Sequence, residues 1–69
     1  MTNTPRRYEL KTYLGTEEFE VLRNKNGRYD IEVVSNGNLY QERNLWYSEA
    51  KKCLMMWGLS FTEIGDLLQ

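Results

Sequence analysis

Residues 44–58, NLWYSEAKKCLMMWG, have the apolar spacing that decides the predicted fold. On a helix of 100° per residue, one apolar stripe is formed by Trp46, Ala50, Cys53, Leu54 and Trp57. Asn44 has the side chain of an N-cap, and Gly58 suits the left-handed position just after a helix. The pattern predicts a long helix with one packing partner, and a sheet is the expected partner.

The first predicted hairpin joins residues 8–14 to residues 17–23. Both runs alternate between apolar and polar side chains, and the Gly-Thr step between them can form a two-residue turn. This turn sets Leu10 opposite Val21 on one face of the sheet, with oppositely charged side chains paired on the other face.

The second predicted hairpin has a three-residue loop at residues 25–27. With Gly27 in the left-handed bulge position, the loop sets Phe19 opposite Val33. We prefer this register to a two-residue Asn-Gly loop, because a slip of one position would turn an apolar face to water.

A fourth strand at residues 38–42 follows another Asn-Gly step. Its register stays open, and either Leu39 or Tyr40 faces the helix. The face expected to pack against the helix carries Leu10, Phe19, Val21, Tyr29, Ile31 and Val33. Trp46 and Trp57 would close this core.

A second, short helix is predicted over residues 61–68. Ser60 and Glu63 have the spacing of a capping box, and Phe61, Ile64 and Leu68 fall on one side of the helix. Residues 58–68, GLSFTEIGDLL, also resemble the opening of a helix-turn-helix, which implies a turn and a DNA-binding helix after them. Capping-box chemistry alone accounts for the same spacing.

Together these elements predict an α+β fold. It consists of a four-stranded antiparallel β-meander with one long helix packed on one face and a short C-terminal helix. We expect a single domain over residues 1–69, with a flexible arm at 1–6, the meander at 7–43 and the two helices at 44–69. One core of this size supplies only about 3–5 kcal/mol of stability.

Composition excludes several classes of protein. With 41% apolar and 28% charged residues, the chain is too apolar to be disordered and too polar for a membrane protein. No run approaches the roughly 18 apolar residues of a membrane span, and the polar start lacks the core of a signal peptide. We therefore expect a cytoplasmic protein without a membrane partner.

Reactive side chains are scarce. The chain has no histidine and a single cysteine, Cys53, so the commonest general base and a zinc site are both missing. Phosphate-binding glycine loops and nucleophile motifs are absent as well. We predict a protein that is not an enzyme and holds no cofactor or metal.

Two surfaces are candidate binding sites for another protein. The sheet face turned away from the helix is mostly acidic, and a methionine on the polar side of the helix can adapt to an irregular partner surface. The candidate residues are Glu18, Glu20, Leu22, Asp30, Glu32, Val34 and Met55. Plain solvation of a one-sided sheet is the competing interpretation.

Basic side chains indicate an alternative, a nucleic-acid-binding accessory protein. The N-terminal arm and the tip of the second hairpin can contact phosphates through Arg6, Arg7, Arg23, Lys25 and Arg28. Because nine Lys and Arg residues face ten Asp and Glu residues, the net charge is −1 and no global field attracts nucleic acid. Another protein is therefore the favoured partner.

The sequence favours a small non-enzymatic protein-binding module that acts as a regulator, inhibitor or accessory subunit. Short proteins of phages and other mobile elements often have this character. A homodimer is also predicted, because the sheet leaves open edges and the core is small. Its expected interface is the strand at residues 8–14 or a patch of Tyr47, Met55 and Met56.

Overall fold

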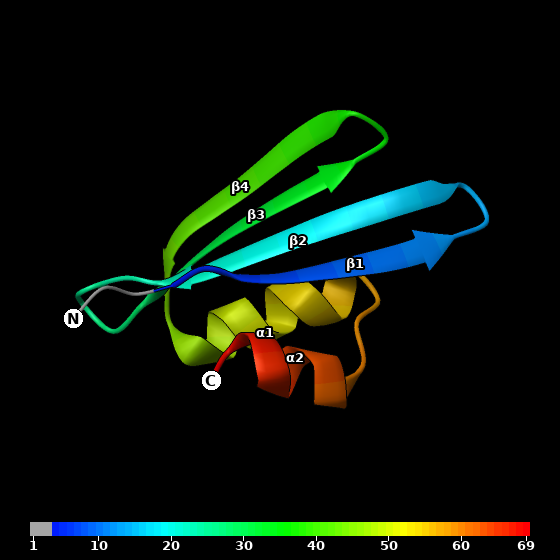
Figure 1. Cartoon of the computed structure of the whole chain (residues 1–69). Helices are drawn as coiled ribbons and strands as arrows, with labels where there is room; N and C mark the ends of the chain where they lie inside the picture. The colour runs from blue at the N-terminus through cyan, green and yellow to red at the C-terminus, as the bar shows by residue number, and fades with distance from the viewer. Residues whose placement is uncertain (1–3) are drawn as a thin grey trace.

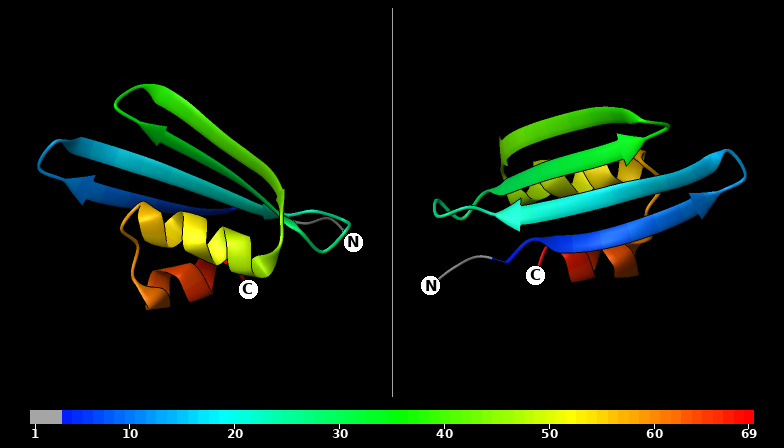
Figure 2. Two further views of the ribbon diagram at one scale, coloured as in Figure 1. Left: turned by 180° about the vertical axis from the view of Figure 1, so that it is seen from behind. Right: turned by 45° about the horizontal axis from the view of Figure 1, so that its top comes forward.

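The computed structural model describes residues 4–69 as a four-stranded antiparallel sheet and two helices (Figure 1). The strands are β1 (Arg6–Thr12), β2 (Gly15–Arg23), β3 (Tyr29–Ser35) and β4 (Asn38–Leu45), and they lie in the sheet in chain order. The helices are α1 (Tyr47–Met56) and α2 (Phe61–Leu67). Both helices lie on the same side of the sheet (Figure 2). The predicted α+β class, with its sheet and two helices, is confirmed.

The first helix is shorter than predicted. It has ten residues and begins after Trp46, while Asn44 lies outside it in a left-handed conformation with φ of 60°. The backbone N–H of Trp46 donates to the Glu49 carboxylate at 2.9 Å, which is one of the two hydrogen bonds of a capping box. The second bond is missing because the indole of Trp46 has no acceptor for a backbone N–H. The Asn44 cap is therefore wrong, and one long helix is not observed.

β1 and β2 pair in a different register from the predicted one. The loop is formed by residues 13 and 14, so that Leu10 lies opposite Glu17 instead of Val21. This shift of four positions is even, and side chains alternate between the faces with a period of two. Each side chain therefore keeps its predicted face although it has a different neighbour.

Two side chains of β1 reach α2. The Arg6 guanidinium donates to the backbone oxygen of Asp66 at 3.4 Å, and the Tyr8 hydroxyl donates to the Glu63 carboxylate. That hydrogen bond raises the pKa of Tyr8 and, together with a backbone N–H, lowers the pKa of Glu63.

Arg6 belongs to β1 and not to the predicted flexible arm, whose first three residues lie outside the described ones.

The second hairpin has the predicted register. Phe19 lies opposite Val33, and Gly27 takes the left-handed conformation with φ of 77°. The N–H of Asn24 donates to the backbone oxygen of Arg28 at 2.7 Å and closes the three-residue loop. Glycine suits this loop because it adopts positive φ without steric cost.

The position of β4 answers the question that the sequence left open. Tyr40 lies opposite Val33 on the inner face, and its ring centre is 5.2 Å from that of Trp57. Leu39 lies opposite Val34 and faces outward. β4 extends to Leu45, three residues beyond its predicted end, after a bulge in the pairing with β3.

The core lies between the inner face of the sheet and the two helices. Its buried residues are Phe19, Val21, Tyr29, Ile31, Val33, Ala50, Leu54, Leu59, Ile64, Leu67 and Leu68. Leu10 and Trp57 are partly buried against this cluster. Trp46 is 57% exposed and Phe61 is 68% exposed, so their predicted places in the apolar stripes are wrong. Only one of the two tryptophans therefore contributes to the core.

The second helix begins at its predicted cap. The N–H of Glu63 donates to the Ser60 hydroxyl at 3.3 Å, and the N–H of Ser60 donates to the Glu63 carboxylate at 2.8 Å. These reciprocal bonds satisfy two backbone donors of the first turn. Neither helix within residues 4–69 has the length and apolar composition that crossing a membrane requires.

Candidate functional site

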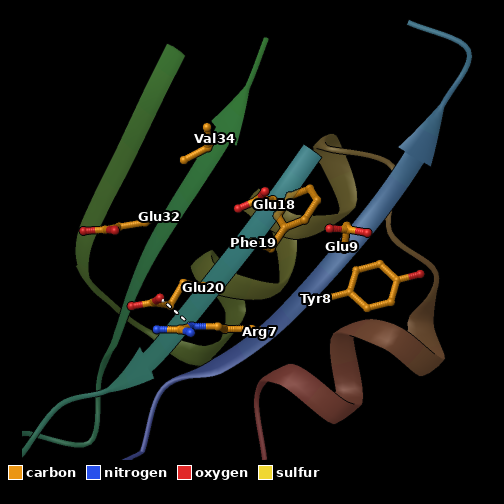
Figure 3. A pocket seen from close by; sticks show the side chains of 8 residues that line it. All are labelled: Arg7, Tyr8, Glu9, Glu18, Phe19, Glu20, Glu32 and Val34. Atoms are coloured by element: carbon orange, nitrogen blue, oxygen red, sulfur yellow. Dashed lines mark hydrogen bonds and ion pairs between the residues drawn. The ribbon is translucent and has the colours of Figure 1, made fainter. Parts of the chain in front are cut away.

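The outer face of the sheet carries two rows of side chains that run across the strands. The first row is Arg7, Glu20, Glu32 and Gln41, and the second row is Glu9, Glu18, Val34 and Leu39. We call these eight residues the acidic face. Six of them are labelled in Figure 3, where α1 passes behind the sheet. The acidic face is therefore turned away from the core.

Two pairs of carboxylates lie directly opposite each other on this face. Glu9 is paired with Glu18 across β1 and β2, and Glu20 is paired with Glu32 across β2 and β3. Like charges at directly opposed positions destabilise a sheet, on the scale of roughly 0.2–1 kcal/mol per pair. A merely solvated face needs polar side chains but not two such pairs. The acidic face thus carries an electrostatic cost that solvation does not explain.

Neighbouring side chains offset only part of this charge. The Arg7 Nε atom lies 2.9 Å from the Glu20 carboxylate, and the Gln41 amide donates to the Glu32 carboxylate at 2.8 Å. The Arg7 side chain is 78% exposed, so this ion pair contributes at most about 1 kcal/mol. With four glutamates and one arginine, the acidic face has a formal charge of −3.

The acidic face surrounds an open hollow of about 560 Å³. Its lining comes from Arg7, Tyr8, Glu9, Glu18, Phe19, Glu20, Glu32 and Val34 (Figure 3). Val34 and Leu39 are 39% and 57% exposed and supply apolar surface beside the carboxylates. Carboxylates next to exposed aliphatic groups suit lysine and arginine side chains, whose methylene stems pack on apolar surface while the charged ends reach the acids.

The structure brings together four of the predicted partner-binding residues, Glu18, Glu20, Glu32 and Val34. Leu22 and Asp30 lie opposite each other on the same face, nearer the β2–β3 loop. Asp30 has a structural contact, because its carboxylate accepts the backbone N–H of Asn44 at 2.8 Å. Met55 is on α1, on the other side of the sheet, and so lies apart from the acidic face.

Four members of the acidic face, Arg7, Glu9, Leu39 and Gln41, were not among the predicted partner-binding residues. Arg7 was missed because the predicted register placed Lys11 opposite Glu20. Leu39 and Gln41 were missed because the register of β4 was open. Strict alternation along β4 is the signal that puts these last two side chains on one face.

The structure separates Arg7 from the other predicted nucleic-acid-binding residues. Arg7 lies on the acidic face, whereas Arg6 and Arg23 line a second hollow of about 470 Å³. Lys25 is in the β2–β3 loop, and the Arg28 guanidinium lies 3.7 Å from the ring centre of Trp46. The basic residues other than Arg7 therefore gather toward one end of the sheet, beside the β2–β3 loop.

Within residues 4–69, no group of three or more His, Cys, Asp or Glu side chains is arranged to hold a metal ion. No protein-family model, curated protein or solved structure matches the chain. The acidic face is therefore identified as the candidate site by its charge, its register and its shape.

Proposed function

We propose that the chain is a non-enzymatic protein-binding module that acts in the cytoplasm as a regulator, inhibitor or accessory subunit. The proposed site is the acidic face, and the proposed ligand is a basic segment of another protein. The observation that supports this function is the presence of two directly opposed carboxylate pairs, Glu9 with Glu18 and Glu20 with Glu32.

Binding of a basic segment would offset the electrostatic cost of the free sheet. A lysine or arginine placed between Glu9 and Glu18 adds two attractions that together outweigh the repulsion between the two carboxylates. The −3 charge of the face also attracts a basic partner over a distance and raises the association rate at low salt. Val34 and Leu39 would contact the aliphatic part of the bound side chains.

Nucleic-acid binding is the second candidate, and it is supported by the residues beside the β2–β3 loop. The Arg28 guanidinium stacks on Trp46, which is 57% exposed, and Lys25 lies nearby in sequence. Cationic side chains beside an exposed aromatic ring are a combination that binds single-stranded nucleic acids. We rank this candidate second because the residues beside the β2–β3 loop include no directly opposed like charges, such as the carboxylate pairs of the acidic face, that a ligand would offset.

Titration of the isotope-labelled protein with a short synthetic peptide of alternating lysine and valine tests the proposed function. We expect amide chemical-shift changes along β1, β2 and β3 that weaken with salt and that Glu18→Lys abolishes. Asp66→Lys is the matched control, because Asp66 is an exposed acid on α2 and its reversal changes the net charge equally. Shift changes that survive Glu18→Lys, or that centre on the β2–β3 loop, contradict the proposal.

A further inference from the structure

The two edges of the sheet are protected unequally. β1 carries charges at four of its seven residues, and Tyr8 and Arg6 attach it to α2. β4 carries charges at only two of its eight residues, and all but its last residue are exposed. An edge strand has unpaired backbone N–H and C=O groups that can pair with another chain unless charges or a covering element prevent it. β4 is the more open edge.

A groove of about 890 Å³ lies between β4 and α1. Its apolar lining consists of Leu39, Tyr40, Leu45, Cys53, Met56 and Trp57, and its charged rim of Glu42, Glu49 and Lys52. Met56 is 81% exposed, and Tyr40 is 47% exposed although it faces the core side of the sheet. The groove therefore leaves large apolar side chains in water directly beside the open edge strand.

Glu42 is the charged group that β4 carries on its inner face, opposite Ile31. The pKa of the nearby Cys53 thiol is raised by burial and further by the charge of Glu42. Within the described part of the chain, the Glu42 carboxylate has no ion pair. An inward-facing charge is one of the devices that protect an edge strand against pairing, so a strand that docks here must give the Glu42 carboxylate a partner.

We propose that β4 pairs in antiparallel fashion with β4 of a second copy of this chain across a two-fold axis. The result is one continuous sheet of eight strands, with four from each copy. Any register centred on a residue keeps the inner faces of the two copies on one side, and these registers include the ones centred on Tyr40, Gln41 and Glu42, near the middle of β4. The register centred on Glu42 sets two carboxylates directly opposite each other, and the one centred on Gln41 leaves them diagonal at about 7–8 Å.

The register centred on Tyr40 has neither disadvantage. It sets the two Tyr40 rings opposite each other, and aromatic cross-strand pairs are favourable. It also sets Glu42 opposite Asn38 of the second copy, whose side-chain amide can donate to the carboxylate. This pairing satisfies the one charged group on the inner face of β4, and it removes two tyrosine rings from water.

A second copy fits the groove better than a chain of uniform charge. The rim carries both signs, so the two-fold axis brings Lys52 of each copy toward the acidic rim of the other. The net charge of −1 per chain gives little repulsion between copies. This interface differs from the two interfaces that the sequence predicted. It uses the β4 edge instead of the first strand, and on the helix it includes Met56 but not Met55. It does not depend on the proposed function, because it is argued from the β4 edge and the groove beside α1 and not from the opposed carboxylates.

Disulfide trapping tests the register. Directly opposed Cα atoms of an antiparallel pair are about 4.5–5.5 Å apart, within the range of a disulfide. In a Cys53→Ser background, Tyr40→Cys should therefore give a covalent dimer on mild oxidation. Leu39→Cys is the matched control, because the proposed register sets it opposite Gln41 of the second copy. Equal cross-linking of the two variants, or none with Tyr40→Cys, overturns the register.

Sedimentation equilibrium tests the dimer itself. We expect a dimer mass at high micromolar concentration, and Met56→Glu should weaken the dimer at least tenfold. Met55→Glu is the matched control and should leave the association unchanged, while circular dichroism checks that both variants stay folded. A monomer mass at high micromolar concentration, or a dimer that Met56→Glu does not weaken, overturns the proposal.

Discussion

Glu18→Gln should make the protein more stable, although it changes an exposed residue of a well-formed strand. Glu18 lies directly opposite Glu9 in the pairing of β1 with β2. Side chains at directly opposed positions start about 5 Å apart, and two unit charges at that distance in water interact by about 0.8 kcal/mol. Screening at physiological ionic strength, with a Debye length of about 8 Å, roughly halves this value.

The other charges near Glu18 largely cancel. Arg7 and Lys11 occupy the diagonal positions on β1, while Glu20 lies two residues along β2 and Glu32 is diagonal on β3. Two cations and two anions at about 7 Å contribute little net energy, so the opposed glutamate decides the sign. We therefore expect Glu18→Gln to raise the unfolding free energy by about 0.8 kcal/mol at low salt and about 0.4 kcal/mol at physiological salt.

Urea denaturation at two salt concentrations measures this gain. The gain should shrink as salt is added, and in a Glu9→Gln background it should disappear, because the repulsion then has no second partner. Asp66→Asn, which removes an exposed charge elsewhere, serves as the control. A Glu18→Gln variant that is less stable than the wild type at low salt would refute the electrostatic reasoning.

Three further predictions concern the fold. Leu54→Ala removes a fully buried side chain and should lower the unfolding free energy by about 2–5 kcal/mol in urea denaturation; a loss below 1 kcal/mol contradicts the described core. Ser60→Ala should cost about 1 kcal/mol and raise amide exchange in α2 first; unchanged exchange there would mean that the cap is unimportant. The Tyr8–Glu63 bond lowers the pKa of Glu63 from 4.5 and raises that of Tyr8 from 10.0. Its stabilisation should therefore be present between these values, and be lost as pH falls through the lowered pKa or rises through the raised one. Tyr8→Phe should flatten both limbs of the pH profile of stability, and an unaltered profile speaks against the bond.

Local turn chemistry predicted one hairpin and failed for the other. The loop at residues 25–27 requires a left-handed residue at Gly27, and the apolar faces on both sides agree with it, so the register of Phe19 with Val33 was readable. In the first hairpin the glycine of the Gly-Thr step lies at the start of β2 and not in the loop. Tyr8 pairs with Phe19, and the Tyr8 hydroxyl bonds to Glu63. These contacts join segments that are distant in the chain, and local sequence does not reveal them.

The start of α1 was misplaced for a similar reason. The N–H of Asn44 donates to the side chain of Asp30, fourteen positions earlier in the chain, and β4 continues to Leu45. The acidic face was largely predictable, because alternation assigns faces even when the register is wrong by an even number. Of the opposed carboxylate pairs, Glu20 with Glu32 follows from the correctly predicted register of the second hairpin. Glu9 with Glu18 was not predictable, because the predicted register of the first hairpin was wrong.

Affinity capture from the source cell tests the central claim most directly, namely that the acidic face binds a basic partner protein. Wild-type protein, Glu18→Lys and Asp66→Lys serve as parallel baits in nuclease-treated lysate at low salt. We predict a protein that the wild type and Asp66→Lys retain equally, that Glu18→Lys loses, and that moderate salt releases from both. If Glu18→Lys retains the same proteins in the same amounts as the wild type, the acidic face is not the binding site.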